Sequence, residues 1–243
     1  MFPLKKIAHR GASGNYPENS RLAFEKAIAA GADMIELDCR LSVDGHVVVF
    51  HDEKLARTTG ARGKMQDKTL EQLRKLDIGK WHGPAFRGER ILTLEEALEI
   101  LHGAVDLCLE IKTTAAVPAG IELKLLFILS HYDYLERTTI SSFEYRSLAR
   151  VRELAPEATL GVLYGSGIHE DPFAAAERLN ASSIHVQKQL ARREFLDQAW
   201  QAGLDIYVWT VNDLREMEMF AALGVQGIIT DYPEKLVRLG RGR

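Results

Sequence analysis

The chain alternates short runs of β-branched and apolar residues with longer helical patterns, and this alternation constrains the fold more than any other feature. Nine runs have the character of strands: 6–10, 34–41, 46–50, 105–112, 138–143, 159–164, 183–187, 205–211 and 227–231. Strands that alternate with helices are typical of a parallel sheet with helical crossover connections. We therefore predict an α/β protein.

Several of the intervening helical patterns carry end signals. The stretch NSRLAFEKAIAAG begins with a capping Asn or Ser and stops at Gly31. The stretch TLEEALEIL begins at Thr93 and has Glu96 three residues on, which is a capping box. The stretch NDLREMEMFAALG has Asn212 as its expected cap and Gly224 as its stop. These signals predict helices between the strands.

The number of strands favours a closed barrel. Run 46–50 follows its predecessor through the tight turn Val43-Asp44-Gly45, so it counts as an extra strand and eight β-α units remain. Eight such units in about 250 residues is the size of a (β/α)8 TIM barrel. A doubly wound open sheet is the alternative, but it would usually carry G-x-G-x-x-G where this chain reads RGASGNYPEN. We predict a single TIM-barrel domain over residues 1–243.

One segment, residues 52–92, interrupts the alternation. It contains five glycines and only one short helical pattern, KTLEQLRKL. A long excursion inside a compact domain is either functional or disordered. The apolar and aromatic residues of the segment argue for order: Leu73, Leu76, Ile78, Trp81 and Phe86. We predict a small folded insertion after the second barrel strand.

Charge and hydropathy exclude several classes of protein. The 243 residues carry a formal net charge of -3, whereas non-specific nucleic-acid binders usually have a basic excess. No apolar run reaches the roughly 18 residues of a membrane span. The opening MFPLKK is not followed by the apolar segment of a secretory signal. We therefore expect a cytoplasmic protein without stable membrane insertion.

Residues that can carry chemistry gather at the predicted carboxyl ends of the strands, where TIM barrels place their active sites. They are His9, Arg10, Glu36, Asp38, His51, Glu110, Lys112 and Trp209. Strand residues two apart point the same way, so Glu36 pairs with Asp38 and Glu110 with Lys112. Three carboxylates in one barrel mouth would repel unless a cation neutralises them, and together they suit a hard divalent metal.

Each of these residues alone has a plainer interpretation. His9 and His51 could each be a hydrogen-bonded core histidine, and Lys112 could form a local ion pair with Glu110. Trp209 could belong to the packing of the barrel. The coincidence of two histidines, two cations and three carboxylates at strand ends is what favours a chemical site.

The two cysteines, Cys39 and Cys108, are too few for a disulfide framework. Cys39 follows Asp38 and should face the helices, whereas Cys108 lies two residues before Glu110 and should point into the barrel. Opposite faces of a sheet do not bring Cβ atoms to bridging distance, so we predict two free thiols.

The motifs HRGASGNYPENS, IELDCRLSVDGHVVVFHDEKLARTTG, LEIK and VWTVN resemble, in the same order, those of the glycerophosphodiester phosphodiesterases. The resemblance runs from residue 6 to about 233 and implies a barrel with a small inserted segment. It also implies one divalent metal ion, Mg²⁺ or Ca²⁺, on Glu36, Asp38 and Glu110. One small departure is Ser20, where the family more often has Thr, and the hydroxyl is kept.

The same resemblance implies roles for the remaining candidates. It makes His9 and His51 an acid–base pair. It makes Arg10 and Lys112 phosphate contacts and places Trp209 beside a glycerol pocket. Four further matches could serve structure alone: Glu18, Asn19, Gln187 and Asp231.

The activity implied by the resemblance is the metal-dependent hydrolysis of a glycerophosphodiester to sn-glycerol 3-phosphate and an alcohol. Two other functions stay open at this stage. One is a related phospholipase D-type or lysophospholipid phosphodiesterase, and the other is a catalytically silent binding barrel. The expected partner is a small-molecule substrate and no nucleic acid, and a homo-oligomer stays open.

Overall fold

The protein is an eight-stranded parallel barrel in the computed structural model, which describes residues 4–113 and 120–240. The barrel strands are β1 (Lys5–His9), β2 (Met34–Leu41), β4 (Asp106–Ile111), β5 (Thr138–Ser142), β6 (Thr159–Tyr164), β7 (Ser183–Gln187), β8 (Asp205–Trp209) and β9 (Gly227–Thr230). β1 pairs in parallel with both β2 and β9, and this double pairing closes the ring. The predicted TIM barrel is confirmed, and the open sheet, which would leave two edges, is excluded.

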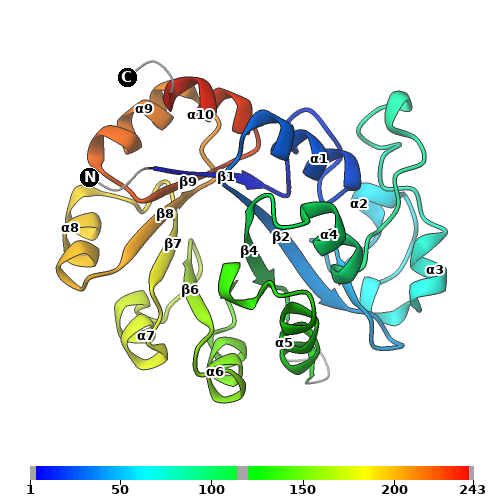
Figure 1. The fold of residues 1–243 in the computed structure, drawn as a ribbon, viewed down its shortest axis with the longest axis horizontal. Helices are drawn as coiled ribbons and strands as arrows, with labels where there is room; N and C mark the ends of the chain where they lie inside the picture. The colour runs from blue at the N-terminus through cyan, green and yellow to red at the C-terminus, as the bar shows by residue number, and fades with distance from the viewer. Residues whose placement is uncertain (1–3, 114–119, 241–243) are drawn as a thin grey trace.

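Helices surround the barrel (Figure 1). They are α1 (Arg21–Ala30), α4 (Leu94–Leu101), α5 (Ile121–His131), α6 (Tyr145–Leu154), α7 (Pro172–Leu179), α8 (Arg193–Gln201), α9 (Leu214–Leu223) and α10 (Pro233–Gly240). A 3-10 turn, η3 (Leu135–Arg137), precedes β5. The extra strand β3 (Val47–Val49) pairs antiparallel with β2 after the expected tight turn and stays outside the ring.

The barrel strands bury side chains on both faces. Outward-facing residues, Cys39 among them, pack against the helices in the main hydrophobic core. Inward-facing residues form a separate cluster inside the barrel: Ile7, Met34, Cys108, Tyr207 and Ile229. Both cysteines are therefore buried on opposite faces of the sheet, and both are free, as predicted.

The observed helix ends agree with the sequence at two helices and differ at a third. Ser20 caps α1, and Thr93 with Glu96 forms the capping box of α4. The cap of α9 is Asp213 and not Asn212, so that prediction was wrong. The side chain of Asn212 is engaged elsewhere, because its amide nitrogen donates to the carboxylate of Asp231.

The segment 52–92 folds at one side of the barrel, coloured cyan to green in Figure 1. It contains α2 (Ala56–Thr59), η1 (Met65–Asp67), α3 (Leu70–Arg74) and η2 (Pro84–Phe86). It has a hydrophobic cluster of its own with the adjoining strand: Val48, Phe50, Leu55, Met65, Leu73, Ile78 and Ile91. Of the residues that argued for order in this segment, Leu73 and Ile78 are buried, whereas the side chain of Trp81 is exposed. The pattern also missed α2, because four residues are too few to show a helical period.

The described residues contain no helix that is both long enough and apolar enough to cross a lipid bilayer.

Candidate active site

A pocket opens at the carboxyl ends of the barrel strands. The candidate residues that line it are His9, Arg10, Glu36, His51, Glu110, Lys112 and Trp209. Asp38 lies beside them and is fully buried. The fold thus brings together all eight residues that the sequence placed at strand ends, although they are spread along the chain from His9 to Trp209.

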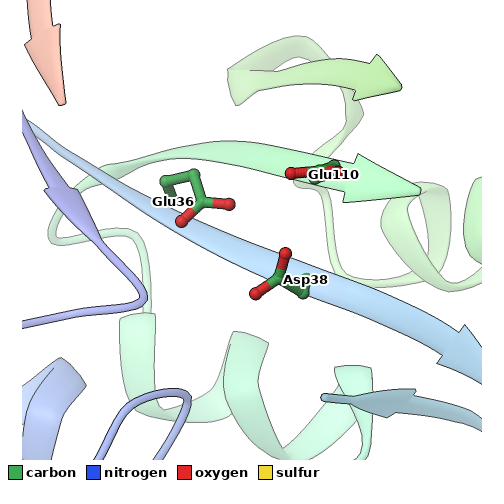
Figure 2. Close-up of side chains that lie close together, drawn as sticks. All are labelled: Glu36, Asp38 and Glu110. Atoms are coloured by element: carbon green, nitrogen blue, oxygen red, sulfur yellow. The ribbon is translucent and has the colours of Figure 1, made fainter. Parts of the chain in front are cut away.

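Three carboxylates form the floor of this site (Figure 2). Glu36 and Asp38 point inward from β2, and Glu110 points inward from β4, where it is paired in register with Asp38. One oxygen of each carboxylate lies within 4.8 Å of those of the other two. Their exposed fractions are 5%, 0% and 8% respectively, so water screens their mutual repulsion poorly.

The pKa values of these carboxylates diverge because of that crowding. Burial raises the pKa of Glu36 well above its ordinary range, and the charge of Asp38 raises it further. Burial also raises the pKa of Glu110, to about 7. It acts in the same direction on Asp38, but Lys112 and Arg10 outweigh it and hold that pKa below its ordinary range. Because burial and mutual repulsion oppose three negative charges in this cluster, a bound cation would stabilise it.

The donor set fits a divalent metal. Oδ1 of Asp38 and Oε1 of Glu110 are buried and accept no hydrogen bond with good geometry. The ammonium of Lys112 lies 3.2 Å from that Asp38 oxygen and also contacts Glu110 Oε1. Carboxylate oxygens that lie this close together are the ligands that Mg²⁺ and Ca²⁺ prefer. Glu36, Asp38 and Glu110 therefore suit such an ion.

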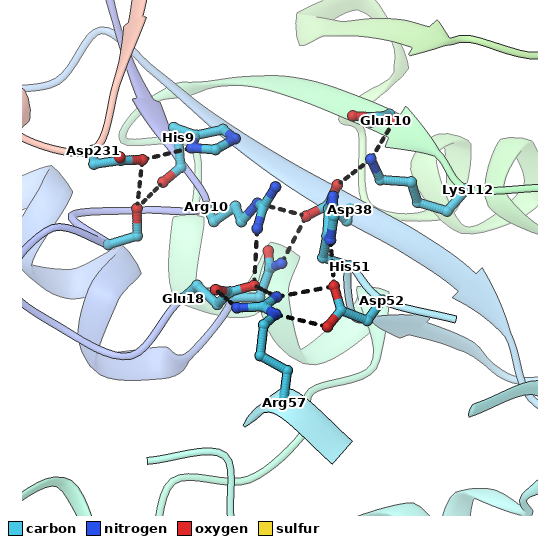
Figure 3. A network of polar contacts seen from close by, with 12 residues as sticks. His9, Arg10, Glu18, Asp38, His51, Asp52, Arg57, Glu110, Lys112 and Asp231 are labelled. Carbon is cyan, nitrogen blue, oxygen red and sulfur yellow. Dashed lines mark hydrogen bonds and ion pairs between the residues drawn. The ribbon is translucent and has the colours of Figure 1, made fainter. Parts of the chain in front are cut away.

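Two histidine–aspartate pairs flank the carboxylates (Figure 3). Nδ1 of His9 lies 2.6 Å from Oδ1 of Asp231, and Nδ1 of His51 lies 2.7 Å from Oδ1 of Asp52. Because Nδ1 is engaged in each ring, Nε2 is left for chemistry in the pocket that both rings line. A carboxylate behind a histidine fixes the orientation of the ring and the position of its proton.

The aspartate behind His9 is itself held in place. Asn212 Nδ2 donates to Asp231 Oδ2 over 2.5 Å, and Ser13 Oγ donates to Oδ1 over 3.1 Å. The sequence did not decide whether Asp231 serves structure or function, and it gave no role to Asp52 or Ser13. The adjacency of Asp52 to His51 could have indicated that pair, whereas no local signal links Asp231 to a histidine 222 positions away.

Arg10 reaches into the site from the end of β1. Its backbone has φ of +53°, and its N–H donates to Glu36 Oε2 over 2.9 Å. Its guanidinium lies 3.2 Å from Asp38 Oδ2 and donates to Glu18 Oε1 over 3.0 Å. A nearby amide, Asn19 Nδ2, donates to the same Asp38 oxygen over 2.8 Å. Glu18 and Asn19 therefore support the charged residues of the site.

An aromatic wall forms the other side of the pocket. Trp209 packs edge-on against Phe143, with ring centroids 5.8 Å apart, and its indole N–H donates to the backbone oxygen of His185. The side-chain oxygen of Gln187 is engaged elsewhere, because it accepts hydrogen bonds from the backbone N–H and the hydroxyl of Ser166. The pocket thus combines a charged floor with an apolar flank.

Comparison with known proteins assigns the chain to a family. Residues 9–235 match the model of the glycerophosphoryl diester phosphodiesterase family. The chain belongs to this family. The assignment made from the motifs is confirmed, and so is the predicted enzyme class, a phosphodiesterase.

Relatives of this phosphodiesterase match it over nearly their whole length. It is 44% identical to a glycerophosphodiester phosphodiesterase of Caldanaerobacter subterraneus subsp. tengcongensis, with 97% of each chain covered. It is 36% identical to one from Bacillus altitudinis, again with 97% of each chain covered. An Oleispira antarctica phosphodiesterase, solved in complex with the product sn-glycerol-3-phosphate, superposes with a TM-score of 0.92 at 29% identity, covering 99% of this chain and 97% of that one.

Proposed function

We propose that this phosphodiesterase hydrolyses glycerophosphodiesters to sn-glycerol 3-phosphate and an alcohol such as choline or ethanolamine, using one divalent metal ion and two histidines. The observation that carries the proposal is the carboxylate cluster flanked by two histidine–aspartate pairs in a single pocket. The relative solved with sn-glycerol-3-phosphate supports the choice of substrate class.

The charges of the site suit an anionic diester. Arg10 and Lys112 bring two cations to the carboxylate floor, and both line the pocket. Charge-assisted hydrogen bonds from such groups to phosphate oxygens are stronger than neutral ones. Glu36, Asp38 and Glu110 would hold Mg²⁺ or Ca²⁺, whose charge attracts phosphate oxygens and lowers the pKa of a nearby hydroxyl. The aromatic wall of Trp209 offers an apolar surface to the carbon atoms of glycerol.

The two histidines supply the proton transfers. Nε2 of one histidine takes the proton of the glycerol 2-hydroxyl, whose oxygen attacks phosphorus. As the bond from phosphorus to the alcohol oxygen breaks, Nε2 of the other histidine gives that oxygen a proton. The resulting cyclic phosphate is opened by water with the two roles exchanged, which restores both histidines to their starting states. Asp231 and Asp52 keep each ring oriented through both steps.

The test is turnover of glycerophosphocholine, glycerophosphoethanolamine and a lysophospholipid, each with and without metal. We expect hydrolysis of the two glycerophosphodiesters, loss of activity in EDTA, and recovery on adding Mg²⁺ or Ca²⁺. Glu110→Gln should resemble metal removal while leaving the fold intact. Full activity after thorough chelation would contradict the metal site. A clear preference for the lysophospholipid would instead favour the lipid-directed activity.

A substrate analogue separates the two routes to the product. A glycerophosphodiester that lacks the glycerol 2-hydroxyl cannot form the cyclic phosphate. We expect no turnover of this analogue. Turnover at the normal rate would show that water attacks phosphorus directly.

The predicted cytoplasmic location stays a prediction, and fractionation of the source cells tests it.

A further inference from the structure

Arg57 lies on α2 of the inserted segment, and its guanidinium bridges two carboxylates beside the site, Glu18 from the loop between β1 and α1 and Asp52 from the start of the inserted segment (Figure 3). Toward Glu18 it donates from Nη1 over 2.6 Å and from Nη2 over 2.7 Å. Toward Asp52 it donates from Nε over 2.7 Å and from Nη2 over 3.0 Å. One planar group therefore makes two double contacts, which is the geometry that a guanidinium suits and an ammonium cannot reproduce.

Each of the two carboxylates reaches on to a different functional residue. Glu18 Oε1 accepts from Arg10 over 3.0 Å, and Asp52 Oδ1 lies 2.7 Å from Nδ1 of His51. Arg10 is the proposed phosphate contact, and His51 is one of the proposed proton-transfer groups. A single carboxylate therefore separates Arg57 from the proposed phosphate contact on one side and from the proposed proton-transfer group on the other.

The two carboxylates of this bridge are more buried than the arginine that joins them. The side chains of Glu18 and Asp52 are only 12% and 22% exposed, so their contacts with Arg57 are partly shielded from water. The guanidinium also lies 5.6 Å from the ring centroid of Trp81, which belongs to the same inserted segment. Although burial opposes it, the hydrogen bond from Arg57 and the charge of Arg10 lower the pKa of Glu18.

We propose that Arg57 is a positioning residue that fixes Arg10 and His51 relative to one another, through Glu18 and Asp52. The inserted segment then completes the active site of the barrel even though it contributes no side chain to the carboxylate cluster. The inference rests on the proposed function, because it takes Arg10 as a binding group and His51 as a proton-transfer group.

The experiment compares Arg57→Gln and Arg57→Lys with the wild type in steady-state hydrolysis of glycerophosphocholine at saturating Mg²⁺. Misplacement of catalytic groups by about 1 Å typically costs on the order of 100-fold in rate, so we expect kcat to fall about 10- to 100-fold in Arg57→Gln. KM should rise in the same variant because Arg10 loses its support. Arg57→Lys keeps the charge but cannot span both carboxylates, so both constants should stay altered.

Single changes on either side of the bridge separate its two effects. Asp52→Asn should lower kcat with little change in KM, and Glu18→Gln should mainly raise KM. Only the Arg57 variants should change both constants. The double variant Arg57→Gln/Asp52→Asn should have a kcat little below that of the poorer single variant, because both changes disturb the same histidine.

Arg62→Gln is the matched control. Arg62 is an exposed arginine of the same inserted segment, and it forms no ion pair among the described residues. It should leave both constants unchanged. Thermal unfolding of each variant shows whether it is folded, and Arg57→Lys carries the test if Arg57→Gln does not fold. Wild-type kcat and KM in folded Arg57 variants would overturn this inference alone. Absence of wild-type turnover would overturn the proposed function on which it rests.

Discussion

Single residues set the acid–base character of this site. His9 and His51 occupy equivalent positions, each with Nδ1 against an aspartate oxygen. The aspartates differ in their partners, since Asp52 is bound by Arg57 and Asp231 by the neutral groups of Ser13 and Asn212. The two histidines therefore lie in unequal electrostatic surroundings, which suits the opposite proton transfers that we propose for them.

Removal of either proposed catalytic histidine tests this arrangement. His9→Ala and His51→Ala should each lower kcat roughly 10²- to 10⁴-fold, with a much smaller effect on KM, because binding is assigned to other groups. The double variant should be little worse than the poorer single variant. His46→Ala is the control, since His46 is exposed and lies outside the pocket. A near-normal kcat in His51→Ala would leave His51 as a packing residue.

A third histidine, His185, lies inside the barrel and also lines the pocket. It is fully buried, its Nε2 lies 3.0 Å from Ser183 Oγ, and its ring stacks on Tyr207. Burial lowers its pKa from the ordinary 6.5 to about 3, and the charge of Lys5 adds to the effect. His185 is therefore neutral in the folded protein over a pH range in which the unfolded chain takes up a proton.

The neutral state of His185 predicts acid sensitivity. Its folded pKa is depressed, so its contribution to stability is present above pH 6.5 and is lost as the pH falls toward 3. Between pH 7 and 5 this single group should cost about 2 kcal/mol of unfolding free energy. Urea unfolding at both pH values measures it, with His185→Gln as reference. An equal loss of stability in wild type and His185→Gln would show that His185 is not the group responsible.

At the scale of elements, strand ends and helix starts meet at the same mouth of the barrel. Strand β2 carries two carboxylates, the carboxyl end of β4 carries a third, and the loop before α9 holds the amide that orients Asp231. Asn212 and its neighbour Asp213 thus have separate tasks. Asp213 accepts from the backbone N–H groups of Arg215 and Glu216 and caps α9.

Mutation can separate the capping role of Asp213 from the orienting role of Asn212. Asp213→Ala removes the cap and should lower the unfolding free energy by about 1 kcal/mol, with kcat unchanged. Asn212→Ala should lower kcat, because Asp231 loses the amide that holds it behind His9. Urea denaturation and steady-state kinetics on both variants provide the measurement. If Asn212→Ala lost stability but kept its full kcat, Asp231 would not depend on that amide for its function.

At the scale of the whole molecule, closure of the barrel places three carboxylates close together and places two basic side chains beside them. Lys112 and Arg10 contact the buried carboxylates directly. We expect these internal ion pairs to let the protein fold without an added ion, because they compensate part of the charge of the cluster. A divalent ion would complete the compensation.

Metal binding should therefore stabilise a protein that is already folded. At a Mg²⁺ concentration about 100 times the Kd, the unfolding free energy should rise by about 2.7 kcal/mol. For a chain of this size the melting temperature should then rise by roughly 5–10 °C. Differential scanning calorimetry with Mg²⁺ or EDTA measures the shift, and Glu110→Gln should lose most of it. Identical melting curves in Mg²⁺ and EDTA would argue against the ion site.

Much of the fold was readable in the sequence because its signals are local. The period of apolar residues predicted every barrel strand, and the capping box at Thr93 marked the start of α4. The spacing of Glu36 and Asp38 predicted one face, because alternate strand residues always share a side of the sheet. Local geometry of this kind depends on neighbours in the chain and so leaves a pattern in it.

The tertiary structure decided which distant residues meet. Asp231 reaches His9 because β9 pairs with β1, and the two residues are 222 positions apart. Arg57 reaches Glu18, 39 positions away, because the inserted segment packs against the mouth of the barrel. Asn212 orients a carboxylate instead of capping a helix for the same reason. The sequence by itself determined the elements and the chemistry at their ends, and closure of the ring determined the partners, because contacts between remote segments leave no local period in the chain.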